Sequence, residues 1–119
     1  MVRKYRNKPV VIDNIKFDSI REGVRYKELK LLEQTGAITK LKLHPRYPLI
    51  CGNTPVQIRN KHGIPRAVFY YADFEYRDCN KNCFNELVVE DVKGFDTANS
   101  RLKRALLEAH YGIRVRIIR

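Results

Sequence analysis

Two acidic residues and a lysine stand at the ends of apolar strand-like segments. One segment leads into Asp73, and the next leads into Asp91 and Lys93. Because side chains alternate along a strand, Asp91 and Lys93 point to one face and Val92 to the other. Charges are rare in such segments unless they are paired or bind a metal. Two carboxylates can hold Mg²⁺, and the lysine can orient a water or stabilise developing negative charge.

Two alternatives remain open for these residues. Asp73, Asp91 and Lys93 could form a partly buried ion pair, although two acids against one lysine leave a negative charge uncompensated. Glu90 points opposite Asp91 in a regular strand, so a bulge would exchange the two acids.

The acids need a frame, and the segments around them predict a β-hairpin. Residues 68–76 and 87–94 read as its two strands, and residues 77–83 form a polar turn between them. A smaller hairpin is expected at residues 9–17, where Asp13 and Asn14 tolerate a left-handed backbone. Residues 38–50 predict a strand interrupted by prolines, and residues 51–66 a loop with a short strand at 56–58.

Two helices complete the expected frame. The first runs from Ser19 to about residue 34, with Gly36 as its C-cap. The second follows a cap at Asp96 or Thr97, ends before Gly112 and leads into a strand at residues 113–118. Its apolar stripe is predicted at Leu102, Leu106 and Ala109. A strand, a helix and another strand predict a right-handed parallel crossover and an α/β fold.

Glu22 has two interpretations. With Ser19 it matches a capping box, in which the acid returns a hydrogen bond to the cap. It also shares a helical stripe with Tyr26 and Leu29, which would turn its carboxylate toward the sheet if that stripe is buried.

The charge balance indicates a polyanionic partner. The chain of 119 residues carries 24 Lys and Arg against 13 Asp and Glu, a formal charge of +11. This excess favours nucleic acid over an anionic membrane, and a merely soluble basic protein is the plainer alternative. The predicted contacts with nucleic acid lie in a basic N-terminal segment, residues 1–8, and in a cluster on the second helix. They are Arg3, Lys4, Arg6, Lys8, Arg101, Lys103 and Arg104.

Length and composition predict one globular domain over residues 1–119, with no membrane span and no signal peptide. The odd set of Cys51, Cys79 and Cys83 suggests a reducing cytoplasm. A zinc site using these cysteines with His44 or His62 lacks a second standard pair, so reduced cysteines are expected. The histidines form no recognisable nucleophile pattern.

The order of these elements and acids resembles the PD-(D/E)xK nuclease superfamily. Ala72-Asp73 corresponds to its first motif, with alanine in place of the usual proline, and Asp91-Val92-Lys93 to its second. The segments 4–8, 17–19, 71–74 and 89–94 resemble a small phage-encoded family within it, similar to Holliday junction resolvases.

This resemblance implies a restriction-endonuclease-like mixed sheet flanked by helices. It implies catalytic roles for Asp73, Asp91, Lys93 and Glu22, with Mg²⁺ or Mn²⁺ held by the three acids and the Val92 carbonyl. It also implies a homodimer in the host cytoplasm that cleaves branched or double-stranded DNA. The alternative is a basic nucleic-acid-binding protein that keeps the fold without catalysis.

Overall fold

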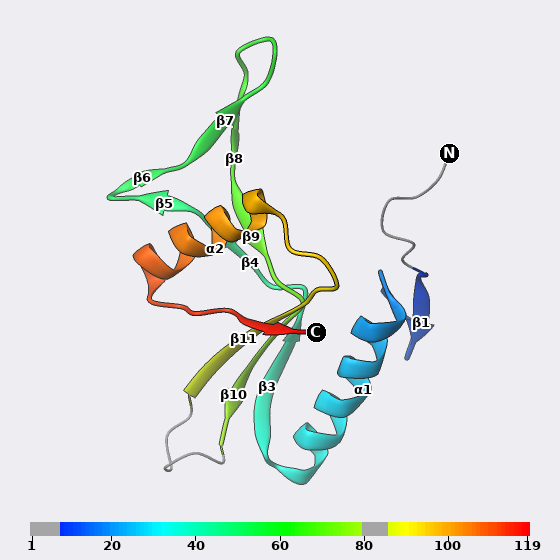
Figure 1. Cartoon of the computed structure of the whole chain (residues 1–119). Coiled ribbons are helices and arrows are strands. Elements are labelled where there is room, and N and C mark those ends of the chain that lie inside the picture. Colours follow the sequence, from blue (N-terminus) through cyan, green and yellow to red (C-terminus); the bar gives the residue numbers. More distant parts are fainter. Residues whose placement is uncertain (1–7, 80–85) are drawn as a thin grey trace.

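A mixed four-stranded sheet with one helix on each face forms the body of the molecule. The computed structural model describes residues 8–79 and 86–119. The strand order is β12 (Arg116–Ile118), β11 (Glu86–Val92), β10 (Phe74–Asp78) and β3 (Ile38–Leu43) (Figure 1). Strand β11 runs antiparallel to β10 and parallel to β12, as expected for a crossover through a helix. The predicted α/β class is therefore confirmed, and β10 and β11 form a hairpin as predicted, although Asp73 lies just before β10 and not within it.

Helix α1 (Ile20–Thr35) begins and ends where the capping signals predict. The Oγ atom of Ser19 accepts a hydrogen bond from the Glu22 amide at 3.1 Å, and Gly36 takes a left-handed φ of 83°. The stripe shared by Glu22, Tyr26 and Leu29 is buried, which the sequence pattern left open. Gly23 is buried in the same stripe. A Cβ atom at this position would come within 2.8 Å of side chains in the N-terminal hairpin, so a glycine allows the helix and the hairpin to approach closely.

That hairpin consists of β1 (Val10–Ile12) and β2 (Ile15–Phe17), as predicted. Its turn residues Asp13 and Asn14 have φ values of 53° and 63°, which these short polar side chains tolerate.

Two hydrophobic clusters lie on the two faces of the sheet. Adjacent residues of β11 divide between them, with Val88 in the cluster that contains Leu29 of α1 and Val89 in the cluster that contains Leu107 of α2 (Ala98–Tyr111). Since successive strand side chains point to opposite faces, the two helices cover opposite faces of the sheet.

Helix α2 is capped by Thr97 and Gly112 as expected, but its predicted apolar stripe is only partly right. Leu106 and Leu107 pack on the sheet, whereas Leu102 is 60% exposed and Ala109 is exposed. Neither helix of the described chain is long and apolar enough to span a bilayer.

The strand predicted at residues 68–76 is two strands. Strand β9 (Phe69–Tyr71) ends before Ala72 and Asp73, and β10 starts after them. The strand predicted at 38–50 is likewise divided into β3, β4 (Arg46–Pro48) and β5 (Ile50–Cys51), and β4 pairs with β9. Both segments therefore leave the main sheet at the same point, where the Asp73 carbonyl accepts from the His44 amide at 2.9 Å.

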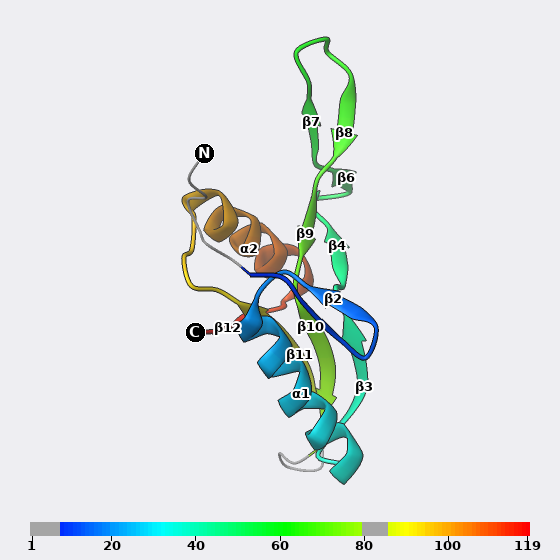
Figure 2. The same cartoon turned by 90° about the vertical axis from the view of Figure 1, so that its right-hand side faces the viewer.

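The prediction of a loop at residues 51–66 is only partly right: the short strand expected at 56–58 corresponds to Gln57–Arg59, but the further strands of this segment were not predicted. After β5 and β6 (Thr54–Pro55), strands β7 (Gln57–Arg59) and β8 (Pro65–Ala67) form an antiparallel hairpin. This hairpin extends away from the sheet and helices in two perpendicular views (Figures 1 and 2). The surrounding segments supply no second face for it to pack on, which is why its pattern resembled a loop.

Candidate metal and nuclease site

A cavity of about 750 Å³ opens where β3, β9, β10 and β11 diverge. Its walls come from the start of α1, the ends of these strands and the segment before α2. They contain every acid predicted for the site, together with Val92 and Lys93. The residues that line the cavity include Glu22, His44, Tyr71, Asp73, Asp91, Val92, Lys93 and Phe95.

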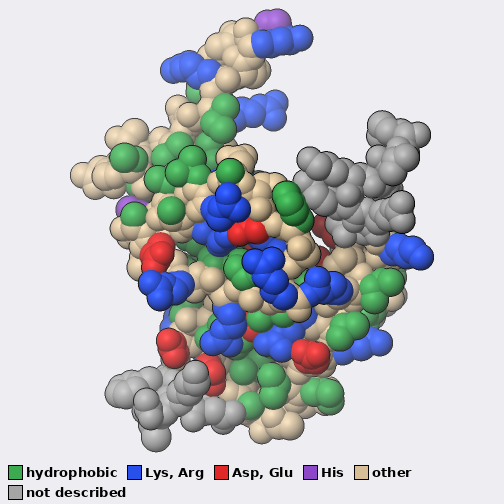
Figure 3. All heavy atoms as spheres, viewed as in Figure 1, with side chains coloured by type: hydrophobic (Ala, Val, Ile, Leu, Met, Phe, Trp, Pro, Cys, Tyr) green, Lys and Arg blue, Asp and Glu red, His purple; other side chains and the backbone are tan. Residues whose placement is uncertain are grey.

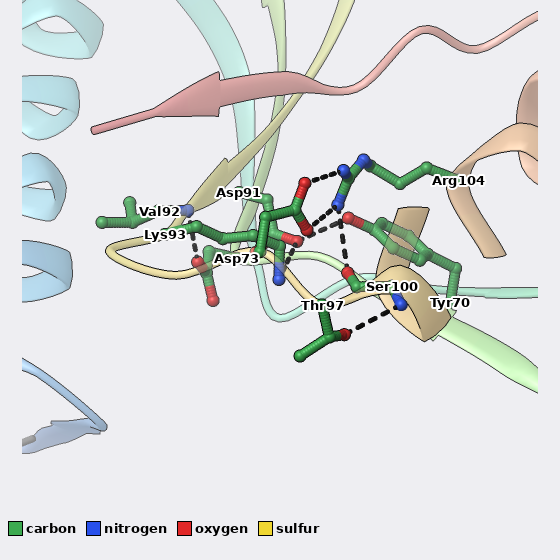
Figure 4. Close-up of polar contacts among 9 residues, drawn as sticks. Tyr70, Asp73, Asp91, Val92, Lys93, Thr97, Ser100 and Arg104 are labelled. Atoms are coloured by element: carbon green, nitrogen blue, oxygen red, sulfur yellow. Dashed lines mark hydrogen bonds and ion pairs between the residues drawn. The ribbon is translucent and has the colours of Figure 1, made fainter. Parts of the chain in front are cut away.

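Asp73 lies in the gap between β9 and β10. Its amide donates to the Glu90 carbonyl at 3.0 Å, which fixes it beside the end of β11. Its Oδ2 atom accepts a hydrogen bond from the Val92 amide at 2.7 Å (Figure 4). Burial, together with a hydrogen bond to the Asp91 carboxyl and its charge, raises the pKa of Asp73 well above its usual range.

Asp91 lies at the end of β11 and is 4% exposed. Its Oδ2 atom accepts a hydrogen bond from the Tyr70 hydroxyl at 2.5 Å and lies 3.2 Å from Nζ of Lys93 (Figure 4). Asp91 and Lys93 therefore share a face, as strand alternation predicts. The amide of Lys93 donates to the Ile118 carbonyl at 2.9 Å, so β12 holds this segment in place.

Glu90 points to the opposite face and is fully buried. Arg25 of α1 binds it with two hydrogen bonds, Nε to Oε1 at 2.8 Å and Nη2 to Oε2 at 2.7 Å, and Tyr76 donates to it. Its two oxygens are thus occupied on the α1 side of the sheet, away from the cavity. The regular pairing of β11 with β10 contains no bulge that would exchange Glu90 with Asp91.

Glu22 reaches the cavity from α1. It is 5% exposed, and its Oε1 atom has no hydrogen-bond partner among the described residues. Burial, followed by the charge of Asp18, raises the pKa of Glu22 to about 7. A buried carboxylate oxygen without a donor is costly, and a bound cation would remove that cost.

His44 also lines this cavity, although the sequence showed no recognisable nucleophile pattern or zinc site around it. Ligand atoms of Glu22, His44 and Asp73 all lie within 4.8 Å of one another, and Nδ1 of His44 is 3.8 Å from Oε1 of Glu22. The signal for it was its position directly after the strand that pairs with β10. The sequence alone does not show the register that sets Leu43 opposite Phe74, so it could not reveal that His44 lies beside Asp73.

These groups suit a divalent cation. Carboxylate oxygens and an imidazole nitrogen are common ligands of such cations, and the raised pKa values of Glu22 and Asp73 reflect burial first and neighbouring acids second. Val92 lines the cavity, but the contact described for it is made by its amide, so its carbonyl stays a predicted ligand.

The predicted nucleic-acid contacts lie in different settings. Arg3, Lys4 and Arg6 fall outside the described residues, and Lys8 is exposed. Arg101 is exposed and Lys103 is half-buried, whereas the Arg104 side chain is 15% exposed and binds Asp96 and Ser100 (Figure 4). Arg104 therefore orders the segment between β11 and α2, which sets it apart from its two neighbours.

Neither of the two described cysteines lines the cavity. Cys51 is exposed, and the Cys79 sulfur lies 3.7 Å from the Thr39 hydroxyl. Both are free thiols, and Cys83 lies outside the described residues.

A family model described as "Protein of unknown function (DUF1064)" matches residues 2–118. Because the match spans nearly the whole chain, the chain belongs to the DUF1064 family. No curated protein and no solved structure matches it. The functional inference therefore depends on the chemistry of the cavity.

Proposed function

We propose that this protein is a metal-dependent DNA endonuclease with a PD-(D/E)xK-type active site on a restriction-endonuclease-like sheet. The observation that carries the proposal is the meeting of Glu22, Asp73, Asp91 and Lys93 in one cavity. These residues come from one helix and two strand ends that are remote in sequence. A simple buried ion pair would not need a third carboxylate whose Oε1 atom has no donor.

Each side chain has a role in phosphodiester hydrolysis. In this reaction, a bond forms between a water oxygen and phosphorus, and the bond to one bridging oxygen breaks. Asp73, Asp91 and Glu22 would hold Mg²⁺ or Mn²⁺, which when bound supplies positive charge at the phosphate and favours deprotonation of water. Lys93, with Nζ 3.2 Å from Asp91, orients that water or stabilises charge on the phosphate.

The positioning of these groups comes from the residues behind them. The Val92 amide holds Asp73 through its Oδ2 atom, and the Tyr70 hydroxyl holds Asp91 through its own Oδ2 atom. These bonds use one oxygen of each acid and fix the direction of the other. Two carboxylates held in this way are a set that Mg²⁺ often takes from a protein.

DNA is the proposed substrate because of the charge of +11 and because the cavity rim is suited to nucleotides. The side chains of Tyr71 and Phe95 line this rim and are 62% and 61% exposed. Aromatic rings in such positions can stack on bases that are unpaired at a branch or an end. A branched substrate is accordingly the form of the proposal that we favour, and cleavage by a homodimer is what the resemblance to Holliday junction resolvases implies.

Incubation with linear, nicked, flapped and four-way DNA, each with Mg²⁺, Mn²⁺ or EDTA, tests the proposal. We expect cleavage with either metal and none with EDTA. Asp91→Asn and Asp73→Asn should abolish cleavage while binding to DNA persists, since Asn keeps the shape and removes the charge that holds the cation.

Binding of all these DNAs without cleavage in any metal would instead favour a basic nucleic-acid-binding protein without catalysis. Full cleavage by a folded Asp91→Asn protein would overturn the assignment of this site.

A further inference from the structure

The chain contains a long stretch that is basic and lacks acids. Between Glu33 and Asp73 there is no Asp or Glu, while six residues are basic: Lys40, Lys42, Arg46, Arg59, Lys61 and Arg66. The last three belong to the projecting hairpin of β7 and β8, residues 57–67, which we call the arm. On the face of the arm seen in Figure 3, Lys and Arg side chains stand out among apolar and uncharged ones, and no acidic side chain is visible.

The arm is exposed on both faces, yet its tip is well ordered by local hydrogen bonds. Every residue from 57 to 67 is exposed. The Asn60 side chain accepts from the amides of His62 and Ile64 at 2.8 and 3.0 Å, and Arg59 donates to the Gly63 carbonyl at 2.8 Å. A two-stranded hairpin is marginal alone in water, so a capped tip keeps this shape without a core.

The base of the arm is continuous with the candidate nuclease site. A second cavity of about 300 Å³ lies between the arm and α2, with Ile58, Arg66 and Lys103 in its walls. Tyr71 lines both this cavity and the larger one that contains the acids. A polyanion in the nuclease site that continued past Tyr71 would therefore meet Lys103 and then the arm.

We propose that the arm inserts into a groove of duplex DNA beside the cleaved phosphodiester, with Arg59, Lys61 and Arg66 on the flanking phosphates. The major groove accommodates a two-stranded β-ribbon. The proposal rests on the nuclease function proposed above and names the partner of a separate surface.

A second copy of this chain is the competing occupant, because Ile58 and Ile64 are 61% and 56% exposed on the arm. Two arms meeting each other would bring basic side chains together without an acid on the arm to pair with them. The charge of the arm therefore favours DNA as its partner.

The test compares two triple variants that each remove three positive charges. The arm variant is Arg59→Gln, Lys61→Gln and Arg66→Gln. The matched control is Lys16→Gln, Lys27→Gln and Lys40→Gln, which alters exposed lysines on β2, α1 and β3. Both are made with Asp91→Asn, so that intact linear duplex is measured in every case. Affinity is measured over a salt series, and a hydroxyl-radical footprint and the mass in solution are recorded.

We expect the arm variant to bind more weakly and to lower the slope of log affinity against log salt by about 2 to 3 units, or about 0.9 for each phosphate that is no longer neutralised. Its footprint should shorten on one side, while the control keeps the footprint and most of the slope.

The two proposals fail in different ways. If duplex DNA binds neither the parent protein nor the variants at low salt, the nuclease proposal falls and the arm proposal with it. If the parent binds and the arm variant shows the same slope and footprint, the arm proposal alone is overturned. A slope that falls equally in the control, or a dimer that dissociates in the arm variant without a change in slope, also overturns it.

Discussion

The Nδ1 atom of His44 lies 3.8 Å from Oε1 of Glu22, in a cavity that is also lined by the carboxylates of Asp73 and Asp91. An imidazole among carboxylates shifts metal preference toward transition metals, because nitrogen ligands suit Mn²⁺ and later metals better than Mg²⁺. His44 is 46% exposed at its side chain, so it can turn toward a cation without leaving a buried gap.

His44→Ala is therefore expected to weaken Mn²⁺ binding more than Mg²⁺ binding. The half-saturating Mn²⁺ concentration for cleavage should rise about tenfold or more, while the Mg²⁺ value changes less. Titration of each metal against the cleavage rate measures both values. His110→Ala serves as the control, since His110 is exposed on α2 and lies outside the cavity. Equal losses for both metals would mean that the imidazole is not a metal ligand.

Glu90→Gln is expected to affect stability and not catalysis. Glu90 is fully buried and bound by Arg25, so removing its charge leaves a partly buried guanidinium without its main partner. The loss in unfolding free energy should be on the order of 3 kcal/mol. Glu28→Gln is the matched control, because Glu28 also pairs with Arg25 at 2.8 Å but is 53% exposed and should cost about 1 kcal/mol or less.

Denaturant unfolding measures both variants, and cleavage is assayed where each is folded. A stable Glu90→Gln protein that cannot cleave would make Glu90 a candidate metal ligand again.

The features that the sequence predicted well depend on local chemistry. The helix caps could be predicted because capping depends on only a few neighbouring residues. These caps are Ser19, Gly36, Thr97 and Gly112. The alternation of β11 likewise placed Asp91 and Lys93 on one face. Placing Glu22 and Asp73 with them depended on the resemblance to the nuclease superfamily, because the sequence left Glu22 with two interpretations.

The features that the sequence missed depend on pairing between distant segments. His44 enters the site through the register of β3 with β10 and through its own left-handed φ of 53°. The arm has no buried face and therefore no alternating pattern. The apolar stripe of α2 was predicted partly at the wrong residues, because the sequence alone does not show that Leu107 is buried while Leu102 is exposed.

Lys93→Ala is expected to reduce turnover more than metal binding. Its Nζ atom lies 3.2 Å from the proposed ligand Asp91, and losing one stabilising donor at the reacting phosphate typically lowers the rate about 10² to 10³-fold. The half-saturating metal concentration should change much less. Single-turnover cleavage at saturating metal separates the two effects, and restoration of full rate by extra metal would reduce Lys93 to a structural partner of Asp91.

The raised pKa of Glu22 predicts how stability depends on pH when no metal is added. The folded value is about 7 against an ordinary 4.5, so the folded protein holds this proton more tightly than the unfolded chain. The contribution of this proton to the free energy of unfolding is fully present below about pH 4.5 and is lost as the pH rises through 7. Asp73 acts in the same direction.

The melting temperature in EDTA should therefore fall between about pH 5 and pH 8, apart from any other groups that titrate there. Mg²⁺ or Mn²⁺ should restore it, with a larger gain at pH 8 than at pH 5.5, because a cation must displace these protons to bind. Thermal unfolding at each pH, with metal or EDTA, gives the comparison. A metal-induced gain that is independent of pH would contradict binding to these carboxylates.

Glu22→Gln separates the capping role of Glu22 from a metal-binding role. The Glu22 amide already completes the contact with Ser19, and its carboxylate has an oxygen without a donor beside His44. Replacing that carboxylate by a neutral amide removes a buried charge. In EDTA at pH 8, the variant should therefore be as stable as the parent protein or more stable, by on the order of 1 to 3 kcal/mol. It should also lose the metal-induced gain in melting temperature and lose cleavage.

Ser19→Ala is the matched control at the same helix end. It removes the cap and should cost about 1 kcal/mol of stability, while the metal-induced gain and cleavage remain. If Glu22→Gln cleaves normally and responds to metal like the parent protein, then Glu22 only supports the start of α1, and Asp73 and Asp91 are the two carboxylates of the site.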